Sequence, residues 1–310
     1  MWFSLPVLLA ATFHPASYAD PVAELGRHLF FDRRLSVNNS RACGDCHKPE
    51  KGFSDGVALP EGATGETLTR NSMALVNLAT AETFGWADNT LTSLALQIRR
   101  PLTNRHPTEM AADDDRVIER LLADDAFMAR WSNVFDQPPN LETIAEGIIA
   151  FQLTLVSDAS PFDRWLVEDI RPPEAVVRGF SLFTSDELRC DRCHRGRELR
   201  REGFVRTGVA SMDEGLMLVT GDPNDRGRFK IPTLRNIAVT APYMHAGQLR
   251  DLPAVIDHYS KGPVPDDPDL DGFILTTDER SDLIAFLESL TDQQFLDNPA
   301  FRAPATISSE

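Results

Sequence analysis

Cysteine is scarce in this sequence, with four among 310 residues, and tyrosine is scarcer still, with three. So few cysteines exclude a disulfide-rich scaffold. Positive charge is also in deficit, because 31 Lys and Arg face 47 Asp and Glu and give a net charge of −16. That balance excludes a broad attraction to nucleic acid or to anionic lipid. The negative charge could instead attract a basic partner surface, or it could serve only solubility.

Long apolar runs are missing beyond the N-terminus. The run from Trp2 to Ala11 is followed by Ser17-Tyr18-Ala19, a small-x-small pattern typical of signal cleavage. We therefore predict a signal peptide over residues 1–19, although a buried N-terminal helix would give a similar run. No other stretch approaches the roughly 20 apolar residues of a membrane span. The sequence thus predicts export to the periplasm, with no membrane span and no nucleic-acid partner.

All the cysteines lie in two pentapeptides, Cys43-Gly-Asp-Cys46-His47 and Cys190-Asp-Arg-Cys193-His194. C-x-x-C-H is the attachment site of a c-type haem, in which two thioethers hold the porphyrin and the histidine ligates iron. One helical turn would bring the three side chains to one face. A redox pair or half of a zinc site would also use C-x-x-C. Two copies without a spare cysteine, in an exported chain, favour two covalent haems.

The rest of the chain is predicted to be mainly α. Thr276 and Glu279 form a capping box, and Pro172-Pro173 precedes another helix start. Helical patterns cover Asp113–Asp125, Leu141–Val156, Glu174–Thr184 and the segment after Thr276. Long irregular stretches are expected over residues 48–70 and 196–230. A G-x-x-L-F echo, at Gly26 and Gly179, precedes each haem motif and indicates two cytochrome c-like domains, 20–171 and 172–310.

The second axial ligand of each iron decides its chemistry, and the residues alone do not choose it. The candidates outside the haem motifs and the signal are His28, His106, His245, His258, Tyr243, Tyr259, Met73, Met110, Met128, Met212, Met217 and Met244. Methionine or histidine would favour electron transfer, an open face would admit peroxide, and a tyrosinate would favour high oxidation states.

Three segments resemble the bacterial di-haem cytochrome c peroxidase/MauG superfamily across the mature chain. They are Leu25–Ser36, Arg70-Asn71-Ser72 and Phe229–Gly247, which contains Thr240-Ala-Pro242-Tyr243. The resemblance implies that the haem of His47 binds hydrogen peroxide and that the haem of His194 is six-coordinate.

The resemblance also assigns side chains near the first haem. Glu109 matches the distal acid–base, Gln97 would orient peroxide, and Pro101 would wall the pocket. A carboxylate there can move a proton between the peroxide oxygens. Trp86 would relay charge between the haems. The plainer alternatives are a solvated Glu109 and a Trp86 that only packs in the core.

At the second haem, the family's peroxidases place a methionine where this chain has Tyr259. A tyrosine there resembles MauG and implies that Tyr259 ligates the second iron. The alternative is a tyrosine packed at the haem edge, with His258 or Met244 as ligand. The family also implies a calcium ion bound by Asn71, Thr240 and Pro242, since oxygen donors suit calcium. Simple turn chemistry is the alternative for Asn71.

The segments Phe84–Gln97 and Val219–Phe229 depart from the peroxidases and resemble MbnH-type MauG-like enzymes. That resemblance implies a di-haem oxidoreductase that uses peroxide, through a high-valent di-haem state, to convert tryptophan to kynurenine on a copper-binding MbnP-type protein. A peroxidase fed by a small cytochrome or cupredoxin is the alternative. A plain electron carrier is disfavoured by Gln97 and Glu109.

Overall fold

The computed structural model describes residues 19–262 and 271–305, so the predicted signal peptide lies almost entirely outside the described residues. The described part is mainly helical, as predicted. Its helices are α1 (Pro21–Phe30), α2 (Cys43–Cys46), α3 (Leu94–Thr103), α4 (Asp114–Leu122), α5 (Asp125–Ser132), α6 (Leu141–Leu153), α7 (Pro161–Glu168), α8 (Glu174–Phe183), α9 (Met217–Thr220), α10 (Leu252–Ser260), α11 (Thr277–Glu288) and α12 (Gln293–Leu296). Strands β1 (Phe204–Arg206) and β2 (Arg228–Lys230) form one antiparallel ribbon.

Local signals place these helices well. Thr276 caps α11 through the predicted box with Glu279, and α8 begins directly after Pro173. Helix α6 starts at Leu141 as predicted but ends at Leu153, three residues early. Beyond the end of the helix, the Leu155 carbonyl oxygen accepts a hydrogen bond from the Asn77 N–H at 2.9 Å and not from a later residue of the same helix.

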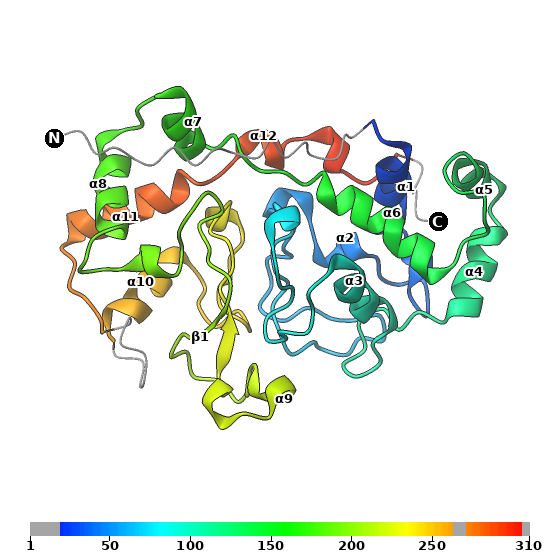
Figure 1. Cartoon of the computed structure of the whole chain (residues 1–310), viewed down its shortest axis with the longest axis horizontal. Coiled ribbons are helices and arrows are strands. Elements are labelled where there is room, and N and C mark those ends of the chain that lie inside the picture. The colour runs from blue at the N-terminus through cyan, green and yellow to red at the C-terminus, as the bar shows by residue number, and fades with distance from the viewer. Residues whose placement is uncertain (1–18, 263–270, 306–310) are drawn as a thin grey trace.

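Two hydrophobic cores give the molecule two lobes, which lie side by side in Figure 1. The first core is built around α1 and α6, and the second around α8 and α11. Phe162 of α7 already belongs to the second core. Phe295, Leu296 and Phe301 return to the first core, where the C-terminal segment lies across it. The predicted domain boundary at residue 171 stays a prediction, and the cores change a few residues earlier in the chain.

The two G-x-x-L-F motifs occupy equivalent places in these cores. A Cβ on Gly26 of α1 would lie 1.8 Å from the Gly147 carbonyl oxygen of α6, and one on Gly179 of α8 would lie 1.9 Å from the Asp282 carbonyl oxygen of α11. Each glycine therefore lets two helix backbones touch. The repeated G-x-x-L-F motif therefore marks the same kind of helix crossing in both lobes.

A Gly179→Ala substitution should destabilise the second lobe. Its methyl group would meet backbone, which yields less readily than a side chain, and overpacking of this kind costs about 1–3 kcal/mol. We expect the thermal midpoint of the haem-loaded protein to fall by several degrees. Ser181→Ala on the exposed face of α8 is the control and should change it little. An unchanged midpoint in the Gly179 variant would show that α8 and α11 can separate without loss.

Candidate functional site

One continuous cavity of about 1390 Å³ lies between the lobes and is lined by residues of both. It exceeds the 300–1,000 Å³ typical of a pocket for one small molecule. Cys43, Cys46 and His47 line it from the first lobe. Cys190, Cys193 and His194 line it from the second. The two pentapeptides, far apart in sequence, therefore face the same interior space.

The first pentapeptide forms the predicted turn of helix. Cys43–Cys46 is α2, and His47 caps its C-terminus. The Asp45 carboxylate accepts a hydrogen bond from the Ala42 N–H at 2.8 Å and closes the turn. His47 Nδ1 lies 2.8 Å from the Phe53 carbonyl oxygen. This bond fixes the ring orientation and makes Nε2 the nitrogen that can ligate a metal.

The second pentapeptide forms a tighter 3₁₀ turn over Cys190–Arg192, where an α-helical turn was predicted. Arg189, with φ at +55°, sets the chain direction just before it. His194 Nδ1 nevertheless lies 3.0 Å from the Leu199 carbonyl oxygen, so the ligand geometry matches the first site. Burial lowers the pKa of His194 to about 4, which keeps the imidazole neutral and able to bind a metal.

The cysteines fit covalent haem better than a disulfide or a zinc site. None of the four forms a disulfide, and burial raises the pKa of Cys43 and Cys190 to about 12. A zinc site would need three or four such ligands grouped together. Within residues 19–262 and 271–305, no cluster of three or more His, Cys, Asp or Glu side chains could hold a metal ion. The residues present thus match a haem held by two thioethers and one histidine in each lobe.

The predicted distal residues of the first site do converge on the cavity. Gln97 and Pro101 project from α3, and Glu109 follows it, held there by a Met110 N–H to Pro101 carbonyl bond of 3.0 Å. Gln97 Oε1 is buried with no hydrogen-bond partner in the described structure. A buried amide without a partner has a cost that a ligand in the cavity would remove.

The environment of Glu109 differs from that of a surface carboxylate. Burial raises the pKa of Glu109 above its ordinary value, while a hydrogen bond with Asn104 and the charge of Arg100 oppose that rise. Glu109 is thus half-buried in the cavity wall, and its acid–base role stays a prediction. Asn104 carried no sequence signal that linked it to Glu109.

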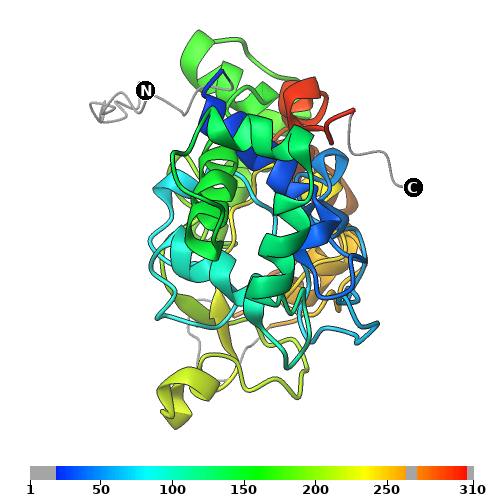
Figure 2. The same ribbon diagram turned by 90° about the vertical axis from the view of Figure 1, so that its right-hand side faces the viewer.

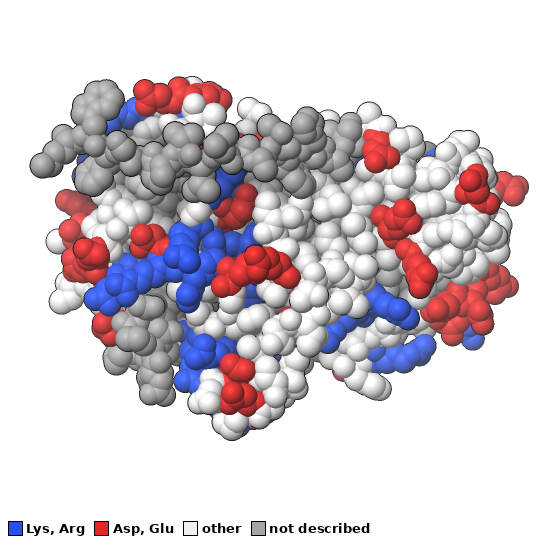
Figure 3. Space-filling model, viewed as in Figure 1, with Lys and Arg blue, Asp and Glu red and all other residues white. Residues whose placement is uncertain are grey.

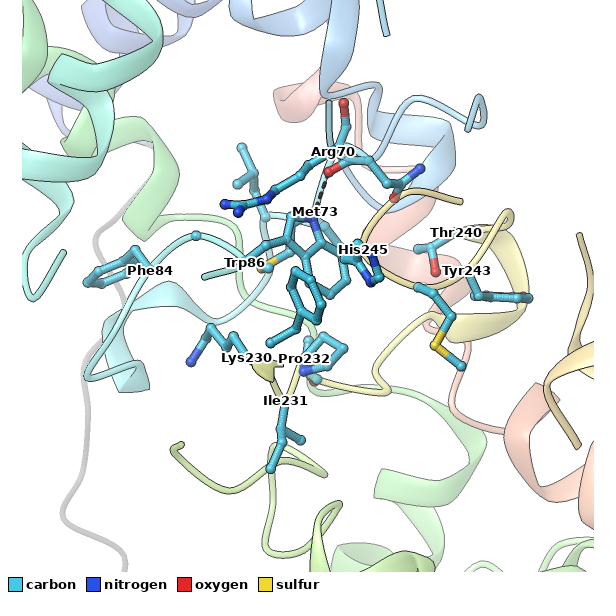
Figure 4. Close-up of a pocket in the computed structure, with 18 of the residues that line it drawn as sticks. Arg70, Met73, Phe84, Trp86, Lys230, Ile231, Pro232, Thr240, Tyr243 and His245 are labelled. Carbon is cyan, nitrogen blue, oxygen red and sulfur yellow. Dashed lines mark hydrogen bonds between the residues drawn. The ribbon is translucent and has the colours of Figure 1, made fainter. Parts of the chain in front are cut away.

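Trp86 lies in the middle of the cavity wall, among residues of both lobes (Figure 4). Its Nε1–H donates to the Asn71 carbonyl oxygen at 2.7 Å. Its own carbonyl accepts the Lys230 N–H of β2, also at 2.7 Å. Trp86 is only half-buried and is not a residue of either hydrophobic core. The indole ring is therefore held by Asn71 of its own lobe, and the Trp86 backbone by Lys230 of the second lobe. The role of Trp86 as a relay stays a prediction.

Among the candidate second ligands, Tyr259 has the most suitable position. It lines the cavity from α10, and burial raises its pKa, to which the nearby Cys193 and Cys190 contribute. Tyr243 instead donates its hydroxyl to the Ile237 carbonyl oxygen at 2.8 Å.

The other two candidates differ from each other. His258 Nε2 lies 2.6 Å from the Thr207 carbonyl oxygen, and His258 is not part of the cavity wall. Met244 does line the cavity. The structure therefore brings Tyr259 close to the second pentapeptide, places Met244 in the shared cavity wall and leaves His258 out of that wall.

The predicted calcium residues Asn71, Thr240 and Pro242 also line the cavity. Asn71 Nδ2 donates to the Val57 and Ala58 carbonyl oxygens at 2.7 and 3.2 Å. Its backbone N–H donates to the His245 carbonyl oxygen at 2.8 Å and so ties the lobes together. The calcium ion stays a prediction.

Sequence reasoning missed a polar contact beside Trp86. Lys230 is 6% exposed, and its Nζ donates to Glu202 Oε2 at 2.9 Å and to Thr83 Oγ1 at 3.1 Å. Thr83 belongs to the first lobe and the other two residues to the second. Thr83, Glu202 and Lys230 are far apart in sequence and meet only in the folded protein, so no local sequence pattern links them.

Two haem-binding motifs facing one cavity, with a tryptophan between them, define a di-haem c-type protein. A family model described as di-haem cytochrome c peroxidase matches residues 20–171. The methylamine utilization protein MauG of Methylorubrum extorquens is 37% identical over 275 residues, covering 86% of this chain and 77% of that protein. This chain belongs to the di-haem cytochrome c peroxidase/MauG family.

Other relatives agree with this assignment. The cytochrome c551 peroxidase of Nitrosomonas europaea is 31% identical, with 91% of this chain and 82% of that protein covered. The crystal structure of a MauG-like protein associated with microbial copper homeostasis has a TM-score of 0.89 and 31% identity, and covers 98% of this chain and 99% of that one. The di-haem peroxidase BthA of Burkholderia thailandensis, at 20% identity and a TM-score of 0.77, shares the fold.

The chain is therefore a di-haem oxidoreductase with two cytochrome c-like domains and one covalent haem in each. The predictions of fold class, family and enzyme class are confirmed. In the described ranges, no helix has both the length and the apolar character to cross a bilayer.

Proposed function

We propose that this oxidoreductase uses hydrogen peroxide to oxidise a partner protein. The observation that carries the proposal is the asymmetry of the two sites. The first site has Glu109 and an unpartnered Gln97, while the second has Tyr259 facing the same cavity. One side is suited to bind and cleave a small ligand, and the other to store charge. When bound, the haems supply the iron that binds peroxide and the orbitals that carry charge between the sites.

The protein residues have separate tasks in this proposal. Glu109 would take a proton from the oxygen of peroxide that binds iron and return it to the departing oxygen, a task that fits its position in the cavity wall. Gln97 orients the peroxide through its unpartnered oxygen, and Pro101 excludes water from that side. Trp86, held from both lobes, would relay charge, and Tyr259 would ligate the second iron. We also propose calcium at Asn71, Thr240 and Pro242, which would fix the wall beside Trp86.

The partner is proposed from a structural relative. The relative with a TM-score of 0.89 is a MauG-like protein associated with copper homeostasis. We propose a periplasmic copper-binding protein of the MbnP type as substrate, with one tryptophan converted to kynurenine. A folded protein cannot enter the cavity, so electrons must leave its tryptophan through the surface of this enzyme.

The experiment is to incubate the haem-loaded enzyme, peroxide and an MbnP-type protein, and to measure the mass of that protein. Kynurenine formation replaces one carbon by one oxygen. We expect this change only with enzyme and peroxide together. A partner that keeps its mass while peroxide is consumed would contradict the proposal. It would favour the second candidate, a peroxidase that takes electrons from a small redox protein, which the peroxidase relatives support.

A further inference from the structure

The second haem motif lies in an arginine-rich stretch of an otherwise acidic chain. Residues 189–206 contain seven arginines and three acidic residues, although the net charge of the whole protein is −16. These arginines are Arg189, Arg192, Arg195, Arg197, Arg200, Arg201 and Arg206. Figure 3 shows Lys and Arg atoms gathered over the segment between α8 and β1. Such local clustering calls for a cause beyond solubility, which net negative charge already provides.

Two of these arginines stand out from the surface on a fixed turn directly after the haem ligand. Arg195 and Arg197 are exposed on either side of Gly196, which has a φ of +70°. We call this segment, Arg195–Arg197, the arginine turn. The Arg197 carbonyl accepts a 2.6 Å hydrogen bond from Arg235, which is 3% exposed. The Arg195 carbonyl accepts the Arg200 N–H at 3.1 Å. The backbone is thus held in place while the two guanidinium groups face outward.

Two of the acidic residues in the stretch do not neutralise this turn, because they pair with buried cations. The Glu198 carboxylate lies 3.2 Å from Arg235, and the Glu202 carboxylate lies 2.9 Å from Lys230. Glu202 also pairs with the buried Arg200 of the stretch, at 3.2 Å, and Arg235 is shared with Asp163 at 2.9 Å. The printed ion pairs of these two carboxylates are therefore with buried cations and not with Arg195 or Arg197.

Five further acidic residues lie within or next to this stretch in sequence or form printed ion pairs with its arginines, fewer than the seven arginines themselves. They are Asp158, Asp186, Glu187, Asp191 and Asp271. Asp158 pairs with Arg197 at 3.1 Å, but both side chains are about half exposed or more. Such an exposed pair contributes little and exchanges partners readily. Screening limits each charge to about 8 Å at physiological salt, so a docking partner responds to this face rather than to the distant charge of −16.

We propose that an acidic surface of the partner protein docks on the arginine turn and exchanges electrons there with the adjacent second haem site. This inference rests on the proposed function and names the chemistry of the partner. Two electrons leave the partner and, with two protons, reduce one hydrogen peroxide to two water molecules. The net charge of the whole enzyme would instead favour a basic partner. The local and the net charge therefore predict opposite preferences for the charge of the partner.

The test uses one redox protein in two charge states. Ferrous mitochondrial cytochrome c is basic, and its fully succinylated form is acidic with the same haem. We expect peroxide-dependent oxidation of the acidic form to be about tenfold faster at physiological ionic strength, where screening confines the effect to the docking face, with the advantage lost as salt rises further. Arg195→Glu with Arg197→Glu should remove that advantage. Arg116→Glu, an exposed site on α4, is the matched control and should retain it.

A separate binding measurement distinguishes this inference from the proposed function. Affinity between the ferric enzyme and each ferric cytochrome is measured without peroxide, so it does not depend on catalysis. Tighter binding of the succinylated form, weakened by the double variant and not by Arg116→Glu, supports the docking site. Tighter binding of the basic form, or equal affinity of the double variant and the unmodified enzyme, overturns it. A failure of peroxide chemistry alone contradicts the proposed function and leaves the binding result to decide the docking site.

Discussion

A Glu109→Gln variant is expected to react with hydrogen peroxide about 10²–10⁴-fold more slowly than the unmodified protein, which is the usual contribution of a positioned general acid–base. The amide keeps the shape of the side chain and its contact with Asn104, but it cannot accept the peroxide proton. Because Glu109 lies in the cavity wall away from the attachment cysteines, haem loading should be unchanged. Stopped-flow absorbance of the ferric protein mixed with peroxide measures the effect.

The pH dependence of the same reaction gives an independent reading of Glu109. Burial raises its pKa, and only the carboxylate form accepts a proton, so the rate should fall on acidification through a value above the ordinary 4.5. The variant should lose that limb of the profile. Glu119→Gln, on the exposed side of α4, is the control and should keep both rate and profile. Equal rates for the Glu109 variant and the control would remove Glu109 from proton transfer.

A Tyr259→Met variant is expected to lose the reaction of the fully oxidised protein with peroxide. A phenolate donates negative charge to iron and stabilises its higher oxidation states, whereas a thioether favours the reduced state. The variant should therefore react only after one electron has been added, like an enzyme that needs a reduced second haem. Peroxide titrations of the ferric and half-reduced forms, followed by absorbance, measure this change.

Tyr243→Phe is the matched control for that experiment. It removes the other phenol of the second lobe, whose hydroxyl is bonded to the Ile237 carbonyl oxygen, and should leave the peroxide reaction of the ferric protein intact. If Tyr259→Met gives the same peroxide spectra as the unmodified protein, Tyr259 is not the ligand. The ligand would then have to be one of the other candidates that line the cavity, Met244 among them.

Sequence patterns found the parts of this molecule that depend on neighbours in the chain. The C-x-x-C-H spacing predicted both attachment sites, and the box at Thr276 and Glu279 predicted the start of α11. The repeated glycine motif indicated two related units, and the structure shows why, since Gly26 and Gly179 both occupy helix crossings. Each of these signals reports a local geometry that few other residues could satisfy.

The parts that sequence reasoning missed depend on contacts between distant segments. The pair of Lys230 and Glu202 beside Trp86 forms only when β2 and the first lobe meet. The return of Phe295 and Phe301 to the first core likewise follows from the path of the C-terminal segment. The 3₁₀ form of the second motif depends on the backbone at Arg189. None of these leaves a periodic or spaced pattern.

The most direct test of the central claim is to mix the fully oxidised di-haem protein with one equivalent of hydrogen peroxide and to record its visible and near-infrared spectrum. If charge is shared between the two sites through Trp86, the ferric Soret band should lose intensity rapidly while a new near-infrared band appears. If the spectrum stays ferric until one haem has been reduced beforehand, the protein follows a conventional peroxidase cycle, and the proposed role of Tyr259 is wrong.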